Sequence, residues 1–231
     1  MAKIKDPREF PAYELTEIAH YIRRPRSTVR SWVMGREYPV GDKKGFFKPL
    51  IHLSDPEKRL FSFFNLVEAH VLDSIRREHR IPLHRVRHAL EYIRKKFYTS
   101  RPLAEKKFLT DGIDLFLNEA GLLVNVSSKG QLHMRENLEN YLKRIEWDER
   151  GLARRLFLFT RKGQADEPRI IVVDPRVSFG RPVLNGTGIP TNIIAERYKA
   201  GETIKELARD YGRGSEEIEE AVRCELQIQA A

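Results

Sequence analysis

Length, composition and charge exclude several classes of protein. The sequence has 231 residues, of which 41% are hydrophobic, enough for packed cores in one large or two small domains. No apolar run approaches the roughly 20 residues that cross a bilayer, and the charged residues 1–7 lack the apolar stretch of a signal peptide. We therefore expect no membrane association. The single cysteine, Cys224, cannot form a disulfide within the chain, so we expect a reducing, cytoplasmic location.

Charge is distributed unevenly along the chain. The net charge is +9, which is typical of proteins that bind nucleic acids, although a basic protein without such a partner would show the same value. Residues 1–168 hold 33 basic and 23 acidic side chains, whereas residues 169–231 hold 9 and 10. A basic part joined to a nearly neutral part predicts two different partners.

The first elements predict a helix-turn-helix. Leu15, Ile18 and Ile22 lie at helical spacing, and Pro25 interrupts this helix because proline disfavours helix in the residue before it. A second helix follows, with Val29 and Trp32 on its inner face. Two short helices joined by a tight basic turn form the pattern of a helix-turn-helix. The outer face of the second helix shows polar and basic residues: Arg26, Ser27, Thr28, Arg30 and Ser31.

A change of pattern after the second helix predicts a β-hairpin. Residues 35–53 are rich in glycine and proline, and residues 42–45 (DKKG) read as the tip of the hairpin. A hairpin with Lys43 and Lys44 at its tip, placed directly after a recognition helix, is a wing. Longer helices are then expected over 62–78 and from Pro82 to Phe97. The outer face of the second of these is strongly basic, with Arg85, Arg87, Arg94, Lys95 and Lys96.

Residues 107–161 predict a mixed α/β module. Alternating apolar residues indicate strands over 113–117 and 122–126, joined by a turn at 119–121, and then a helix over 138–145 and a strand over 156–159. Residues 162–168 (KGQADEP) are the best candidate for a linker. A strand over 170–173, a turn-rich stretch to Pro190 and three helices follow.

These elements predict an α+β fold that is mostly α. We expect a winged helix-turn-helix over 8–100, a mixed α/β module that could serve dimerisation over 101–163, and a trihelical partner-binding domain, preceded by a short strand, over 169–231. His84 and His88 have the spacing of a helical metal pair, but their basic neighbours favour a solvated face. No catalytic constellation occurs in a signature context, so we expect no enzyme, no metal and no cofactor.

Two segments resemble known families. The segment YELTEIAHYIRRPRSTVRSWV, with the helices after the hairpin, is similar to MerR-type regulators over about residues 11–97. That resemblance implies contacts of Arg24, Arg26, Ser27, Thr28 and Arg30 with the major groove, and of Lys43 and Lys44 with the backbone or minor groove. The segment VVDPRVSFGRPVLNGTGIPTNIIAERYKAGETIKELARDYGRGSEEIEEAVR resembles the domain-of-unknown-function 433 family, which is associated with VapB-type antitoxins. Many relatives carry arginine where this chain has Gly188.

The two resemblances together imply a DNA-binding antitoxin of a type II toxin–antitoxin pair. It would repress its own operon as a homodimer on double-stranded operator DNA and neutralise a PIN-domain ribonuclease. The expected partner-binding residues lie in the turn-rich stretch: Arg176, Phe179, Arg181, Asn185 and Thr187. The alternative is a MerR-like transcriptional regulator whose C-terminal domain senses a small molecule or a protein.

Overall fold

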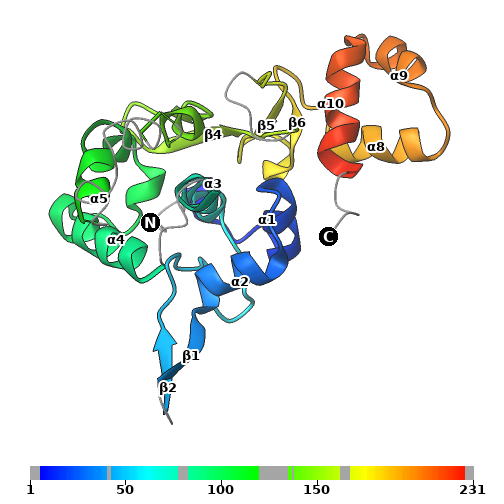
Figure 1. The fold of residues 1–231 in the computed structure, drawn as a ribbon. Coiled ribbons are helices and arrows are strands. Elements are labelled where there is room, and N and C mark those ends of the chain that lie inside the picture. The colour runs from blue at the N-terminus through cyan, green and yellow to red at the C-terminus, as the bar shows by residue number, and fades with distance from the viewer. Residues whose placement is uncertain are drawn as a thin grey trace, which may run out of the picture.

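The structure is a computed structural model that describes residues 6–40, 43–77, 83–119, 135–136, 138–161 and 167–226. Helices predominate, accompanied by a two-stranded hairpin and a four-stranded sheet (Figure 1). The predicted α+β class is therefore confirmed.

One buried helix organises the N-terminal half. The chain begins with a 3-10 turn, η1 (Pro7–Glu9), followed by α1 (Leu15–Tyr21), α2 (Arg26–Met34), the hairpin β1 (Arg36–Val40) and β2 (Lys43–Phe47), α3 (Phe63–Arg77) and α4 (Leu83–Phe97). Every residue from 62 to 75 is buried, and α3 lies at the centre of the molecule with the other elements around it (Figure 1). A helix that is covered on all sides serves as the core of its domain.

The segment after α4 is helical, which corrects the predicted strand over 113–117. It contains η2 (Pro102–Ala104), a π-helical turn η3 (Phe108–Gly112) and α5 (Ile113–Glu119). Ile113, Phe116 and Leu117 are buried, at the spacing of one helical face, whereas Leu115 is only partly buried. The apolar alternation that suggested a strand was therefore part of a helical stripe. The second predicted strand, 122–126, and most of the predicted turn lie outside the described residues.

The sheet follows, with all neighbouring strands antiparallel in the order β3 (Ile145–Trp147), β4 (Ala153–Phe157), β5 (Ile171–Val173) and β6 (Val183–Leu184). Residues 138–142 are helical, as predicted, but Ile145 already begins β3. The strand predicted over 156–159 is β4, which begins and ends earlier, and the strand predicted over 170–173 is β5. A turn η4 (Ser178–Gly180) separates β5 from β6.

This sheet crosses the predicted linker at 162–168. Residues 162–166 lie outside the described part, but β4 and β5, on either side of them, pair through Leu156 with Val173. The buried guanidinium of Arg144 donates to the carbonyl oxygens of Glu167 at 2.6 Å and Pro168 at 3.2 Å. The three-part division of the chain stays a prediction. Because β4 and β5 pair in one sheet, the residues before and after 162–166 are joined by backbone hydrogen bonds as well as by the chain itself.

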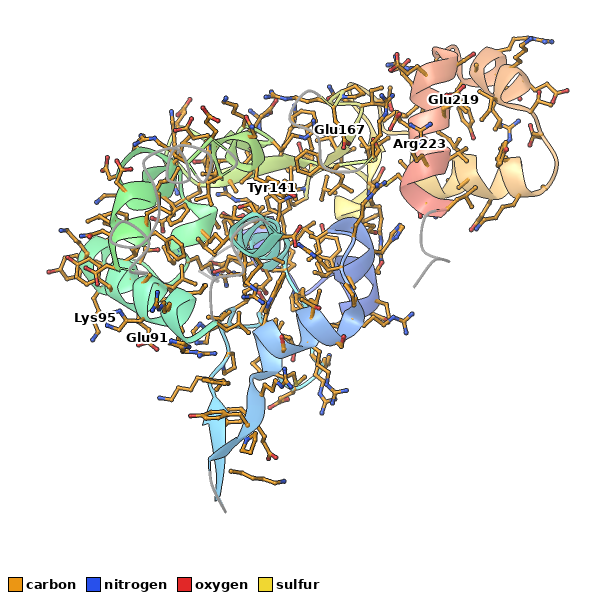
Figure 2. The ribbon with its side chains drawn as sticks, viewed as in Figure 1. Glu91, Lys95, Tyr141, Glu167, Glu219 and Arg223 are labelled. Atoms are coloured by element: carbon orange, nitrogen blue, oxygen red, sulfur yellow. The ribbon has the colours of Figure 1, made fainter. Side chains whose placement is uncertain are left out.

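Three helices close the described chain and form a lobe at one end of the molecule (Figure 1): α8 (Thr191–Lys199), α9 (Ile204–Tyr211) and α10 (Ser215–Leu226). Ile194, Leu207 and Ile218 are fully buried between them. Besides α8 and α9, α10 contacts β5 and β6, so the lobe is attached to the sheet through this helix. Glu219 and Arg223 mark successive turns of α10 (Figure 2).

Candidate nucleic-acid interface

The helix-turn-helix is built by short-range hydrogen bonds and a shared apolar face. The Glu17 carboxylate accepts a hydrogen bond from the backbone N–H of Glu14 at 2.8 Å, which satisfies a donor at the start of α1. The chain then turns through Arg23, whose φ of 55° is left-handed, and α2 begins directly after Pro25. Ile18, Val29 and Trp32 are fully buried and hold the two helices together.

The outer face of α2 presents polar and basic side chains to solvent. Arg26, Ser27 and Arg30 are exposed, and no described residue hydrogen-bonds or ion-pairs with the two guanidinium groups. Thr28 and Ser31 are half-buried, and the Ser31 hydroxyl donates to the carbonyl of Thr28 at 2.7 Å. Three of the predicted residues are therefore available to a ligand without rearrangement, whereas the Ser31 hydroxyl is already engaged within the helix.

Both arginines of the turn point inward, which changes the role of Arg24. Arg23 donates to the carbonyl oxygens of Thr160 and Arg161. The guanidinium of Arg24 forms an ion pair with Asp73 of α3, whose side chain is 2% exposed. The prediction placed Arg24 at the major groove, but in the structure it joins the turn to the central helix. Its charge is used within the fold.

The hairpin lies where the wing was predicted, but its tip is shifted. Val40 pairs with Lys43, so Lys43, Lys44 and Gly45 belong to β2 and not to the tip. The ammonium of Lys44 lies 3.0 Å from the carboxylate of Glu37, and both side chains are largely exposed. The side chain of Lys43 lies outside the described part of the structure. The structure thus contains a β-hairpin directly after α2, and Lys43 and Lys44 lie on its second strand.

Glycine and aromatic stacking give the hairpin its shape. Gly35 joins α2 to β1 with a φ of 74°, and a Cβ atom there would lie 2.1 Å from the carbonyl oxygen of Phe47. Only glycine fits this position without a shift of the backbone. The rings of Tyr38 and Phe47 stack with centroids 3.9 Å apart.

Two arginines of α4 brace the base of the hairpin. Arg87 donates to the carbonyl of Lys48, and its guanidinium lies 5.2 Å from the ring centroid of Phe47. Arg94 donates to the carbonyl of Leu50 at 2.6 Å. The sequence placed both on one exposed basic face, but the structure turns them toward the hairpin. Arg85, Lys95 and Lys96 remain exposed, and Figure 2 shows Glu91 and Lys95 on the outer side of α4.

A second candidate surface is the loop between β5 and β6. Ser178 and Phe179 adopt left-handed φ values of 46° and 55°, and Gly180 follows with 78°. Left-handed conformations of residues other than glycine cost free energy, and they cluster at binding and active sites. The Phe179 side chain is 94% exposed. The loop therefore holds a large apolar side chain in solvent.

The other predicted partner-binding residues lie around this loop. Arg176 and Arg181 are exposed, whereas Asn185 and Thr187 are half-buried. The Thr187 hydroxyl donates to the carbonyl of Leu184 at 2.8 Å, within its own turn. Arg176, Phe179 and Arg181 are thus the most accessible members of the predicted set.

The loop is fastened to the helix-turn-helix by contacts that the sequence did not reveal. The Tyr13 hydroxyl donates to the carbonyl of Gly180 at 2.8 Å, and Arg181 forms an ion pair with Glu17 of α1. In the same region, His20 of α1 lies 3.8 Å from the Glu225 carboxylate. The partners in the first two contacts are 167 and 164 residues apart in the sequence, and each alone reads as an ordinary polar or aromatic residue.

Neither a metal site nor a membrane span is found in the described part of the chain. It contains no group of three or more histidine, cysteine, aspartate or glutamate side chains placed to hold a metal. His84 and His88 are both exposed, and the ring of His88 lies 3.9 Å from the Glu119 carboxylate. No helix among the described residues combines the length and apolar character of a membrane span.

Comparisons with known proteins match two separate segments of the chain to protein families. Residues 11–90 match the family described as "Putative DNA-binding HTH domain", and residues 171–223 match "Protein of unknown function (DUF433)". The chain is 29% identical to "Putative antitoxin VapB45" of Mycobacterium tuberculosis, over 93% of each chain. It is 25% identical to "Uncharacterized protein Rv2308" of the same organism, over 91% of this chain and 88% of the other.

A solved structure shares the fold. The crystal structure of Rv2018 from Mycobacterium tuberculosis superposes with a TM-score of 0.67 at 24% identity, covering 93% of this chain and 98% of the other. Separately, two observations support the assignment of α1 and α2 as a helix-turn-helix: the geometry of the two helices and the family match over residues 11–90.

Proposed function

We propose that this protein is a DNA-binding antitoxin that represses its own operon and neutralises a PIN-domain ribonuclease. The observation that carries the proposal is the outer face of α2, where Arg26, Ser27 and Arg30 are exposed without protein partners among the described residues. A named antitoxin relative over nearly the whole chain supports the second half.

The DNA half of the proposal uses α2 and the hairpin. Exposed arginines at the start of a second helix can reach phosphates and the edges of bases in the major groove. Lys44, on β2, extends the positive surface, and we assign Lys43 the same role. The Thr28 hydroxyl can accept or donate at the same groove, and the Ser31 oxygen, whose proton is donated to Thr28, can accept there. A single unit of this size reads few base pairs, so we propose that a homodimer binds a palindromic operator.

The partner half uses the loop between β5 and β6. A large exposed aromatic side chain is a frequent anchor at protein interfaces, since it buries much area for little loss of side-chain entropy. Phe179 would fill an apolar pocket of the toxin, and Arg176 would face its acidic, metal-binding site. Arg181 would face the same site after exchanging its ion pair with Glu17 for the toxin's carboxylates. Asn185 and Thr187 would add polar contacts at the rim.

Salt-dependent binding tests the DNA half. Fluorescence anisotropy with DNA from upstream of the gene should give a log–log salt slope that falls by about 0.9 for each phosphate contact removed. Arg26→Ala and Arg30→Ala should each weaken binding and reduce the slope. Arg209→Ala is the matched control, because Arg209 is also an exposed arginine but lies on α9. If both α2 variants bind as the control does, α2 is not the DNA-reading helix.

Co-purification with the product of the neighbouring gene tests the partner half. Phe179→Ala should weaken toxin capture by about 30-fold, the effect of losing an interface anchor worth about 2 kcal/mol. Tyr98→Ala is the control, because Tyr98 is 97% exposed and has a similar φ of 53°. The same variants should be compared in a growth-rescue assay with the toxin expressed. Equal capture by the two variants would exclude Phe179 as the anchor.

A further inference from the structure

A cleft lies between the N-terminal segment and the sheet, away from the residues proposed for DNA, and of the residues proposed for the toxin it contains only Arg176. Its volume is about 660 Å³, and it is a depression that is more open to solvent than enclosed. The lining comes from three places in the chain: the start of the described chain, the β3–β4 turn with β4, and the turn after β5. These residues are Asp6, Pro7, Arg8, Trp147, Asp148, Glu149, Arg150, Arg154 and Arg176.

The two carboxylates on one side of the cleft, Asp6 and Asp148, share the single cation Arg8. Arg8 forms ion pairs with Asp6 at 2.6 Å and Asp148 at 2.7 Å and also donates to the carbonyl of Ala153. Asp148 accepts two further hydrogen bonds, from the backbone N–H groups of Arg150 and Leu152, both at 2.9 Å. The hydrogen bond from Arg8 holds the pKa of Asp6 below its usual value. Burial raises the pKa of Asp148, but its hydrogen bonds outweigh burial and lower that pKa as well. Both carboxylates are thus already engaged within the protein.

Three further cations line the cleft, and the charge of one of them, Arg176, also lowers the pKa of Asp6. The Arg150, Arg154 and Arg176 side chains are exposed, and no described residue forms an ion pair with them. Because Leu156 pairs with Val173 in the antiparallel β4–β5 register, Arg154 lies close to the turn that carries Arg176. The next residue, Arg155, is instead paired with Asp174 at 2.7 Å. Adjacent arginines of one strand therefore differ: one is neutralised within the sheet and the other is available.

Trp147 adds an aromatic wall to this cluster of arginines. Its side chain is half-buried against the core and lines the cleft. Guanidinium groups bind phosphate with paired, charge-assisted hydrogen bonds, and an indole ring stacks on the flat face of a nucleobase. We propose that the cleft binds a nucleoside phosphate, with the phosphate on Arg150, Arg154 and Arg176 and the base against Trp147. The ligand is a free nucleotide or the 5′-phosphorylated end of a single strand, since both present the same chemistry.

Tryptophan fluorescence gives a direct test in the full chain. The protein has two tryptophans, and Trp32 is 1% exposed, so an added ligand can change the signal mainly through Trp147. Adenosine 5′-monophosphate should quench the fluorescence saturably, and it should bind at least tenfold more tightly than adenosine or inorganic phosphate alone. The response should disappear in Trp147→Phe. Absence of saturable quenching up to millimolar concentration overturns the proposal, as does equal affinity for inorganic phosphate.

Charge variants locate the phosphate. Arg154→Ala and Arg176→Ala should each weaken binding about tenfold, the effect of one charge-assisted hydrogen bond. Glu149→Gln should tighten it several-fold, because Glu149 is an exposed carboxylate of the same lining. Arg209→Ala, with the same change of charge on α9, should bind as the unaltered chain does. If Arg154→Ala and Arg176→Ala match that control, the cleft does not hold the phosphate.

Two competitors distinguish the ligand. A 5′-phosphorylated tetranucleotide that binds at least tenfold more tightly than adenosine 5′-monophosphate identifies a strand end as the ligand, and equal or weaker binding identifies the free nucleotide. An acidic hexapeptide should not compete. Displacement of the nucleotide by that peptide at similar concentration overturns the proposal in favour of a protein ligand. None of these readouts depends on operator binding or on the toxin.

Discussion

The contact between Gly180 and Tyr13 predicts how strongly the loop between β5 and β6 is attached to the helix-turn-helix. A Cβ atom added at Gly180 would lie 2.4 Å from the Tyr13 hydroxyl oxygen, and the φ of Gly180 is +78°. Gly180→Ala should therefore be penalised twice, by backbone strain and by a clash. Tyr13→Phe removes the oxygen that the new methyl group would meet. The next-nearest atom, Tyr13 Cζ, lies 3.4 Å away and allows the methyl group to fit.

The free energies can be estimated for each component. A left-handed conformation costs a residue other than glycine about 1–2 kcal/mol, a lost hydrogen bond costs about 1 kcal/mol, and overpacking costs about 1–3 kcal/mol. Gly180→Ala alone should thus destabilise the fold by about 2–5 kcal/mol, and Tyr13→Phe alone by about 1 kcal/mol. The double variant keeps the strain and the lost hydrogen bond but not the clash, so it should cost about 2–3 kcal/mol. Because a Cβ atom 2.4 Å from the hydroxyl oxygen makes the clash larger than the lost hydrogen bond, this is less than the cost of Gly180→Ala by itself.

Urea unfolding of the full chain, followed by circular dichroism, measures all three variants. Gly186→Ala is the control, because Gly186 also has a positive φ, +74°, but a Cβ atom added there would meet no atom within 4 Å. That control should show the cost of backbone strain alone, about 1–2 kcal/mol. If the double variant instead loses the sum of the two single effects, the loop is not packed on Tyr13 and the reasoning fails.

Three further predictions concern the Arg24–Asp73 ion pair, the buried Glu68 carboxyl and the segment between β4 and β5. Arg24→Ala should lower the free energy of unfolding by about 2–3 kcal/mol, because it removes a cation from the buried Asp73 carboxylate, whereas Arg26→Ala should leave stability unchanged in the same urea titration. Burial raises the pKa of Glu68 from 4.5 to about 7, so the stability that its protonation contributes is fully present below pH 4.5 and is lost as the pH rises through 7. Glu68→Gln should abolish this loss, which amounts to about 2–3 kcal/mol between unfolding curves at pH 5 and pH 8. An unchanged difference between the two pH values would contradict the raised pKa of Glu68. Cleavage at a protease site inserted within 162–166 should leave the two fragments together in gel filtration, because β4 pairs with β5 across the cut; separate elution would contradict the pairing.

The sequence by itself determined the positions of α1, α2 and the hairpin, because the signals for these elements lie within a few neighbouring residues. Apolar spacing and a proline located α1 and α2, and the glycine- and proline-rich stretch located the hairpin, since these signals act over a few residues. The same kind of signal failed for α5. Its apolar residues 113, 115 and 117 alternate like a strand, and only the packing of Ile113, Phe116 and Leu117 against the core decides for helix. A short apolar run does not carry enough periodicity to separate the two.

Tertiary structure decided which charged residues are free to act. The sequence contains Arg24, Arg26 and Arg30 as equivalent basic residues near one turn, and only the position of Asp73 on α3 turns the first of them inward. In the same way, Arg154 and Arg155 are neighbours in the sequence, and the β4–β5 pairing brings Asp174 to one and not to the other. An ion pair requires the two charged groups to lie a few ångströms apart. The partners are 49 residues apart in the sequence for Arg24 and 19 for Arg155, so the sequence alone does not show that they meet. The sequence could name the basic residues, but their burial and pairing were set by the fold.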